Sequence, residues 1–219
     1  MLEHVWDRAS ESRYLTGLLI ATDDERIRSA ASAFKARVLM TRSDHESGTD
    51  RVAEAASTTD AHLVVNIQGD EPLIDPSAID AAILGMLDAE TVPMGTLSKR
   101  IERPEEIHNP NVVKVVTDRH GDAIYFSRSP IPFHREAGDT TPYYKHIGLY
   151  IYQRDFLLGY PDMRVGPLER SERLEQLRAL ENGYKIRVVE TDYESLGVDT
   201  PEDWEHVSQF FERNSFNNG

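Results

Sequence analysis

Two adjacent carboxylates, Asp70 and Glu71, follow a short apolar run that ends in the tetrapeptide Gly-Asp-Glu-Pro. The β-branched run at 63–67 predicts a strand that is buried on both faces of a parallel sheet. Ligands of open α/β sheets bind beyond the carboxyl ends of the strands, and magnesium prefers oxygen ligands. We therefore expect a site for a divalent cation, and through it a phosphate, at this strand end. The alternative is a solvated acidic turn.

Two other segments could contribute to such a site. Ser47-Gly48-Thr49 precedes a predicted helix, whose free amide groups and flexible glycine could meet an anion or a base edge. An ordinary helix cap at Thr49 is the alternative. Asp199 stands just before Thr200, which can cap a helix whose first residue is a proline. Its alternative role is to interact with the helix dipole.

A predicted strand at 145–152 presents polar and apolar side chains in alternation. The apolar face carries Ile147, Leu149 and Ile151 and can pack on a core. His146 and Tyr150 are on the other face, together with Gly148 and Tyr152, and could face a cleft. A single histidine on a strand is also a common structural residue.

Helix and strand patterns alternate along most of the chain, which predicts a single α/β domain with a mostly parallel sheet and a small antiparallel extension. The extension includes a hairpin that turns around Gly121. The pattern at 168–182 predicts one continuous helix with the stripe Leu174, Leu177 and Leu180. The other predicted helices are 1–12, 24–34, 49–57 and 76–87, and the other predicted strands are 18–21, 38–40, 95–97, 112–116, 123–126 and 186–189.

The composition excludes several classes of protein. Among the 219 residues, 38 are acidic and 24 basic, and the formal net charge is -14. With no run of Lys and Arg, nucleic acid is an unsuitable partner. No apolar run approaches the length of a membrane span, the first residues do not resemble a signal peptide, and the absence of cysteine is compatible with a reducing compartment. We expect a cytoplasmic protein.

Eight segments, in this order, resemble the 3-deoxy-manno-octulosonate cytidylyltransferase (CMP-KDO synthetase) family. Each is weak alone, but together they are specific. They are ATDDERI from Ala21, MTRSDHESGTDR from Met40, VNIQGDEP from Val65, NPNVVKVV from Asn109, YFSRSPIP from Tyr125, KHIGLYIY from Lys145, PLERSERLEQLRALENG from Pro167 and GVDTPED from Gly197.

The resemblance implies a Rossmann-like nucleotidyltransferase that transfers CMP from CTP to the anomeric hydroxyl of 3-deoxy-D-manno-octulosonate (KDO) for lipopolysaccharide synthesis, with pyrophosphate leaving. It implies a homodimer, with a sugar-binding and dimerisation extension at about 123–165. Asp70 and Asp199 become the catalytic carboxylates that hold Mg²⁺. The implied nucleotide-binding residues are Ser47, Gly48, Thr49 and Arg51, and the implied KDO-binding residues are Gln68, Arg128, His146, Tyr150, Glu175 and Gln176.

The sequence departs from the family at its amino-terminal side. The family's first strand and its phosphate-binding loop, of the type IPARxxSxRLPGKPL, have no counterpart here, because Met1 to Val5 match the helix that follows them. We expect neighbouring strands to have unpaired edges. The alternatives are a start assigned at an internal methionine and a truncated paralogue. The first predicts that an upstream-extended protein is active and that these 219 residues are inactive or poorly folded. The second predicts a non-catalytic sugar- or nucleotide-binding protein. A related sugar-acid cytidylyltransferase is a further alternative.

Overall fold

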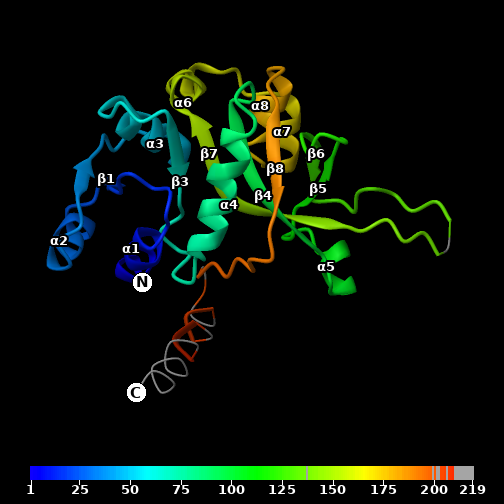
Figure 1. Cartoon of the computed structure of the whole chain (residues 1–219), viewed down its shortest axis with the longest axis horizontal. Helices are drawn as coiled ribbons and strands as arrows, with labels where there is room; N and C mark the ends of the chain where they lie inside the picture. Colours follow the sequence, from blue (N-terminus) through cyan, green and yellow to red (C-terminus); the bar gives the residue numbers. More distant parts are fainter. Residues whose placement is uncertain (137, 199, 201–202, 206, 210–219) are drawn as a thin grey trace.

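A computed structural model describes residues 1–136, 138–198, 200, 203–205 and 207–209. A mixed sheet runs through the molecule, and helices cover it on both faces (Figure 1). The helices are α1 Leu2–Ser10, α2 Glu25–Ala33, α3 Gly48–Ser57, α4 Pro76–Leu87, α5 Pro104–His108, α6 Arg154–Gly159, α7 Pro167–Glu172 and α8 Leu177–Glu181, and η1 Tyr160–Asp162 is a 3-10 turn. The strands are β1 Ile20–Thr22, β2 Val38–Met40, β3 Leu63–Asn66, β4 Met94–Arg100, β5 Lys114–Thr117, β6 Ala123–Ser127, β7 Tyr144–Gln153 and β8 Ile186–Glu190. This arrangement confirms the predicted α/β fold class.

Strand β7 is the centre of the larger sheet. The strand order is β6-β5-β7-β4-β8, and β3 pairs with β7 as well. Strand β7 is antiparallel to β3, β4 and β5, whereas β4 and β8 are parallel. The hairpin of β5 and β6 confirms the predicted antiparallel extension, and Gly121 at its turn has a φ of +80°, which glycine adopts without strain.

Strands β1 and β2 form a separate, parallel two-stranded sheet. Among the described residues, β1 pairs only with β2, and β3 pairs only with β7. Both strands therefore have an unpaired edge, as the departure from the family pattern predicted. The expectation that β3 lies buried within a parallel sheet is wrong, because its partner is antiparallel and its first three residues are only half-buried.

Two hydrophobic clusters hold the layers together. The first packs α1 and α4 against the face of β7 that carries Ile147, Leu149 and Ile151. The second joins α3, α6 and α8 to the opposite face, around Tyr152 and Tyr160. The predicted alternation along β7 is confirmed, since the three aliphatic residues are buried, whereas His146, Gly148 and Tyr150 on the other face are half-buried.

The predicted continuous helix at 168–182 is wrong. Helix α7 ends at Glu172, and the left-handed backbone of the next residue, Arg173 (φ 52°, ψ 50°), breaks the helix before α8 begins. The Glu181 carboxylate accepts hydrogen bonds from the amides of Leu168 and Glu169, at 2.9 and 3.0 Å. It thereby folds α8 back onto the start of α7 and satisfies amides that have no partner inside the helix. The break leaves residues 174–176 in a turn, where Leu174 packs in the second cluster.

Helices α2 and α4 begin at the capping residues that the sequence predicted. The side chains of Asp24 and Asp75 accept hydrogen bonds from the amides of Arg26 and Ser77 and so cap α2 and α4. At α3 the cap is Ser47, which forms a reciprocal capping box with Asp50, so the alternative of a cap at Thr49 is wrong. Among the helices of the described residues, none is both long and apolar enough to cross a membrane.

Candidate active site

The polar face of β7 forms the floor of the candidate site. His146 and Tyr150 are neighbours on this face, with ring centroids 5.4 Å apart. Gly148 lies between them in the alternation, and a Cβ added there would meet no atom within 4 Å. The face is therefore open above the glycine and flanked by two side chains that form hydrogen bonds.

Hydrogen bonds to Thr96 define the tautomer of His146. The Thr96 hydroxyl has one hydrogen to donate, and the carbonyl oxygens of Ile147 and Leu149 lie 3.0 and 2.9 Å from it. His146 Nε2 also lies 2.9 Å from this hydroxyl, so Nε2 is the donor and the hydroxyl oxygen accepts. Nδ1 is then an acceptor. Burial lowers the pKa of His146 to about 4, so the ring is neutral at pH 7.

A buried amide group lies beside Tyr150. Gln176 is 3% exposed, and its Oε1 accepts a hydrogen bond of 3.1 Å from the Tyr150 hydroxyl. Its Nε2 has no hydrogen-bond partner among the described residues. A buried donor without a partner costs about 1–3 kcal/mol, so this nitrogen is suited to bind an acceptor on a ligand.

The Ser47 loop meets the turn before α8. The Ser47 hydroxyl donates to Glu175 Oε1 over 3.2 Å, and the Thr49 side chain lies beside those of Glu175 and Tyr152. Burial raises the pKa of the Glu175 carboxyl above its ordinary value. The structure thus brings two predicted nucleotide-binding residues into contact with a predicted sugar-binding residue. Gly48, between them in sequence, is exposed.

Arg51 and Arg128 already have protein partners. The Arg51 guanidinium lies 3.2 Å from the Asp23 carboxylate and also donates to Thr41. The Arg128 guanidinium donates to the backbone carbonyls of Glu172, Pro110 and Arg173, at 2.7, 2.9 and 3.4 Å. Arg128 thereby attaches the end of β6 to the turn that carries Glu175 and Gln176.

The loop that precedes β5 is held by a buried ammonium group. Lys114 is 0% exposed, and its Nζ donates to the carbonyls of Asn109, Val112 and Arg128, at 3.1, 2.6 and 2.5 Å. Burial lowers the pKa of Lys114 below its ordinary value. This contact fixes the backbone of Arg128 in addition to its side chain.

Asp70 and Glu71 point to different surroundings. Asp70 is half-buried, and no described residue donates a hydrogen bond to its carboxylate. Glu71 is 8% exposed, and its oxygens accept hydrogen bonds from Tyr193 and Ser195. Of the two adjacent carboxylates, Asp70 is therefore the one available to a ligand. Gln68, two residues earlier, is exposed at the same strand end.

The available carboxylate fits the chemistry of a magnesium site, which needs few protein oxygens and is completed by water and substrate oxygens. The second predicted ligand, Asp199, lies outside the described residues. In the described part of the chain, no group of three or more His, Asp and Glu side chains is arranged to hold a metal ion. The backbone amide of Val198, the residue before Asp199, donates to the Asp70 carbonyl over 2.9 Å.

Sequence reasoning missed the residues that position this site: Thr96, Lys114, Glu172, Tyr193 and Ser195. Most of their contacts are with residues distant in sequence, such as the pair Tyr193 and Glu71, separated by 122 positions. Only Lys114 left a signal, because a lysine inside a β-branched strand must find partners for its ammonium group.

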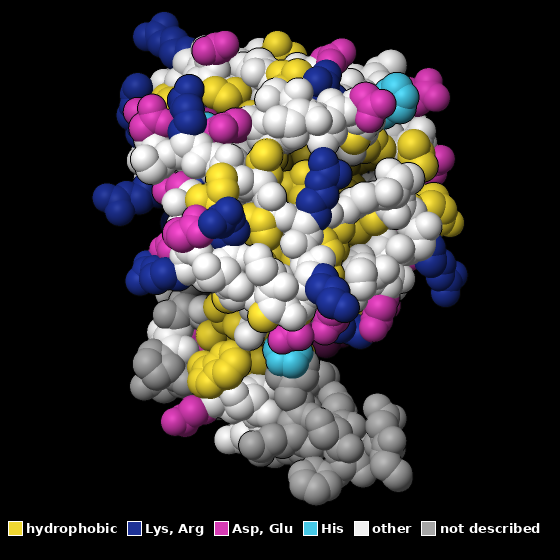
Figure 2. All heavy atoms as spheres, turned by 90° about the vertical axis from the view of Figure 1, so that its left-hand side faces the viewer, with side chains coloured by type: hydrophobic (Ala, Val, Ile, Leu, Met, Phe, Trp, Pro, Cys, Tyr) yellow, Lys and Arg dark blue, Asp and Glu magenta, His cyan; other side chains and the backbone are white. Residues whose placement is uncertain are grey.

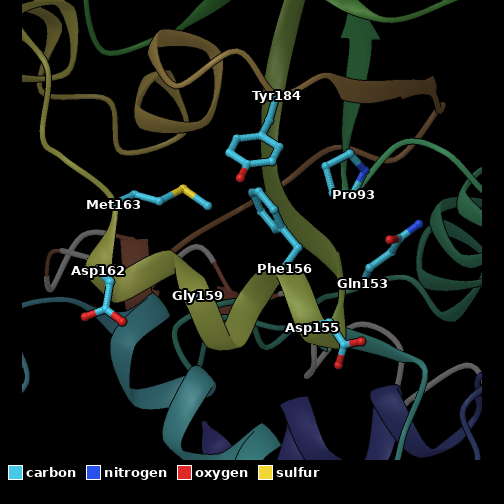
Figure 3. Close-up of a pocket in the computed structure, with 8 residues that line it drawn as sticks. All are labelled: Pro93, Gln153, Asp155, Phe156, Gly159, Asp162, Met163 and Tyr184. Atoms are coloured by element: carbon cyan, nitrogen blue, oxygen red, sulfur yellow. The ribbon is translucent and has the colours of Figure 1, made fainter.

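The residues that line a pocket beside α6 include none of the predicted site residues. This pocket is lined by Phe156, Met163 and Tyr184 near the carboxylates of Asp155 and Asp162 (Figure 3). On the side of the molecule that carries β1 and α2, acidic and basic side chains are interspersed, with hydrophobic side chains between them (Figure 2). That face offers no continuous basic field for nucleic acid.

Comparisons with known proteins agree with this fold. The family model for cytidylyltransferases matches residues 1–186. A 3-deoxy-manno-octulosonate cytidylyltransferase of Solibacter usitatus (strain Ellin6076) is 70% identical over 96% of this chain and 84% of its own length. One from Geobacter metallireducens (strain ATCC 53774 / DSM 7210 / GS-15) is 50% identical over 97% of this chain and 88% of its own. A solved structure of CMP:2-keto-3-deoxy-manno-octonic acid synthetase complexed with CTP superimposes with a TM-score of 0.93 and 40% identity, covering 97% of this chain and 88% of that one.

The fold and the matched segment define a nucleotidyltransferase of the cytidylyltransferase class. Within that class, the chain belongs to the 3-deoxy-manno-octulosonate cytidylyltransferase family.

Proposed function

We propose that this protein transfers CMP from CTP to KDO, releasing pyrophosphate, as the names of its relatives indicate. The anomeric hydroxyl of KDO attacks the α-phosphorus of CTP as the bond to pyrophosphate breaks. The observation that carries the proposal is the unpartnered Nε2 of the buried Gln176, whose Oε1 accepts a hydrogen bond from Tyr150. A polyhydroxy acid supplies the acceptors that this donor lacks.

The sugar would lie over the polar face of β7. His146 Nδ1 accepts a hydrogen bond from a sugar hydroxyl, because Nε2 is engaged with Thr96. Gln176 donates to a second hydroxyl oxygen, and Glu175 and Gln68 would bind further hydroxyl groups. Arg128, which is attached to the turn that carries Glu175 and Gln176, supplies positive charge for the KDO carboxylate. Three carbonyls hold its guanidinium, and a guanidinium retains donors beyond those.

The nucleotide would bind along the Ser47 loop. Gly48 is exposed, and a Cβ there would meet no atom within 4 Å, so a base or ribose can approach the backbone. The side chains of Ser47 and Thr49 face Glu175 and serve to position this loop. Arg51 bridges the loop to Asp23 at the end of β1. The contacts to the nucleotide itself are therefore made chiefly by backbone groups.

Asp70 and Asp199 would hold Mg²⁺. When bound, the ion neutralises charge on the triphosphate and on the leaving pyrophosphate. Support comes from the available Asp70 carboxylate and from the hydrogen bond that joins Val198, which precedes Asp199, to the Asp70 backbone. Glu71 turns inward and leaves Asp70 as the carboxylate at this strand end.

We propose further that the protein acts as a cytoplasmic homodimer in lipopolysaccharide synthesis, with residues at about 123–165 as the dimerisation extension. Support comes from two exposed hydrophobic side chains in that segment, Ile124 at 61% and Phe133 at 86%. Analytical ultracentrifugation tests this directly. Ile124→Asp combined with Phe133→Asp should give monomers if the extension forms the interface, and an unchanged dimer would place the interface elsewhere.

The activity of the 219 residues alone is a separate question. The unpaired edges of β1 and β3 would accept another strand between them, and the predicted site's arginines are already paired within the protein. These observations support the proposal that a strand and a basic phosphate-binding loop complete the enzyme. They also favour the second candidate, a non-catalytic binding protein.

The experiment compares this chain with a version extended upstream in its own reading frame. CMP-KDO formation is assayed from CTP, KDO and Mg²⁺, with a sialic acid as the alternative acceptor. Turnover by the extended protein alone supports both the function and the missing loop. Turnover by the 219-residue chain contradicts the need for that loop. Calorimetric binding of KDO or CTP without turnover by either protein supports the binding-protein alternative.

A further inference from the structure

The segment that follows β8 lies against the strand end that carries Asp70. We call residues 191–198 the strap. At its start, the Thr191 amide donates to the Ser98 carbonyl over 2.9 Å, and at its end the Val198 amide donates to the Asp70 carbonyl over 2.9 Å. The strap therefore connects the edge of the sheet to the strand end that carries Asp70, and Asp199 follows it in sequence.

Glu71 holds the middle of the strap. Its Oε2 accepts a hydrogen bond of 3.0 Å from the Tyr193 hydroxyl, and its Oε1 accepts one of 2.7 Å from the Ser195 hydroxyl. Glu71 is 8% exposed, and hydrogen bonds to a buried charged group are among the stronger ones in proteins. Because Glu71 directly follows Asp70, this contact fixes the strap to the Asp70 backbone.

Glu194 holds the other side of the strap. Its carboxylate pairs with Lys99 at 2.7 Å and with Lys145, and Lys145 also lies 3.1 Å from Glu106. Alternate residues of the strap are thus bound to opposite sides: Tyr193 and Ser195 to the Asp70 loop, and Glu194 to β4 and β7. The ion pairs fix the strap to the sheet, whereas the Glu71 contacts and the Val198 amide fix it to the strand end that carries Asp70.

We propose that Glu71 is a positioning residue for the metal site. It does not touch the ion. It holds Tyr193 and Ser195 so that the chain leading into Asp199 stays beside Asp70. The inference rests on the proposed magnesium site. Partners that orient metal ligands in this way typically change metal affinity about 10- to 100-fold when they are removed.

Two variants separate positioning from charge. Glu71→Gln removes the negative charge and weakens the contact, whereas Tyr193→Phe with Ser195→Ala removes the contact but keeps the carboxylate. Tyr184→Phe with Ser171→Ala, both at exposed positions, is the matched control for the loss of two hydroxyl groups. Mn²⁺ alone is the probe, and its affinity is measured by electron paramagnetic resonance of the free ion. Hydrogen exchange of the Val198 amide reports the strap independently of any metal.

Both Glu71→Gln and the Tyr193/Ser195 variant should bind Mn²⁺ about 10-fold more weakly or worse, and the Val198 amide should exchange faster in both, with the control unchanged. Weaker binding by Glu71→Gln alone would overturn the proposal, because charge or direct ligation would then explain it. Unchanged Mn²⁺ affinity in both variants would overturn it too, even if they melt earlier. If the parent chain binds no Mn²⁺, the proposed metal site is wrong and Glu71 has no positioning role for it. Exchange of the Val198 amide would still report whether Glu71 holds the strap.

Discussion

The Ser47 hydroxyl and the Glu175 carboxylate are joined by a hydrogen bond of 3.2 Å, although 128 positions separate them in sequence. The first residue caps α3, and the second lies in the turn between α7 and α8. Movement of the Ser47 loop with this bond intact would displace the turn that carries Glu175 and Gln176. We expect the binding of CTP and KDO to be coupled through this contact.

The charge of Glu175 should lower stability at neutral pH. Burial raises the folded-state pKa of this carboxyl, so the folded state binds more protons than the unfolded state between the two pKa values, and stability falls as pH rises through that window. Glu175→Gln cannot ionise. Urea unfolding at pH 4.5 and 7 should show a smaller loss of stability in this variant than in the parent. The exposed Glu3→Gln is the control, and equal losses in parent and Glu175→Gln would contradict the prediction.

Gln176→Leu should weaken KDO binding without unfolding the protein. The substitution removes an unpartnered buried donor but also the acceptor of the Tyr150 hydroxyl, so the free protein should lose about 1–3 kcal/mol and remain folded. In the upstream-extended version of the proposed enzyme, the KM for KDO should rise about 10- to 100-fold, corresponding to one lost hydrogen bond in a buried site, while the KM for CTP changes little. Steady-state kinetics measures both constants. An unchanged KM for KDO would remove Gln176 from the sugar site, and the exposed Gln209→Leu serves as the control.

His146 should make the protein less stable in mild acid. Its pKa is lowered to about 4 in the folded state from 6.5, so the unfolded state binds the proton more readily between these values. Stability from this group is present above pH 6.5 and is lost as pH falls towards 4, by roughly 3 kcal/mol at most. The difference in unfolding free energy between the parent and His146→Asn should therefore shrink on acidification. Parallel pH profiles in urea would contradict this prediction.

Asp70→Asn and Asp199→Asn should each reduce Mg²⁺-dependent turnover by about two orders of magnitude or more, because each removes a charged ligand of the ion. Raising the Mg²⁺ concentration should partly restore the rate if affinity is what is lost. The assay uses the extended protein, with the exposed Asp88→Asn as the control. Near-normal rates for either variant would exclude that residue from the ligand set.

Lys114→Met should destabilise the fold by about 3 kcal/mol or more, since three carbonyls lose their donor in a buried place. It should also raise the KM for KDO, because one of those carbonyls belongs to Arg128. Lys185→Met is the matched control, because the Lys185 side chain is 64% exposed and pairs with Asp122; its cost should stay within about 1 kcal/mol. Equal unfolding midpoints for both variants would contradict the special role of Lys114.

Most elements could be predicted because their signals are local. The caps at Asp24 and Asp75, the turn at Gly121 and the alternation along β7 depend on neighbours in sequence. The helix predicted over 168–182 was wrong because its break depends on Glu181 reaching back to the start of α7. Leu174 and Leu177 are buried in the observed structure, and a continuous helix would bury them too. The apolar stripe therefore could not distinguish a continuous helix from a broken one.

The residues of the candidate site also fall into two groups: those that the sequence could predict and those that depend on contacts with distant segments. Residue types and the family resemblance identified His146, Tyr150, Glu175 and Gln176, and the structure brings these four together. The inward orientation of Glu71 could not be foreseen, because it requires the strap, more than 100 positions away. The paired state of Arg51 and Arg128 was equally hidden, since their partners come from other elements.

Strand β7 carries His146 and Tyr150 and is hydrogen-bonded to β3, β4 and β5. Many binding sites lie on loops that open at little cost. Here the floor of the site belongs to the centre of the sheet, so the amides beneath it should exchange only through the rarest openings of the molecule. Occupation of this site by a sugar would then slow exchange in three neighbouring strands together.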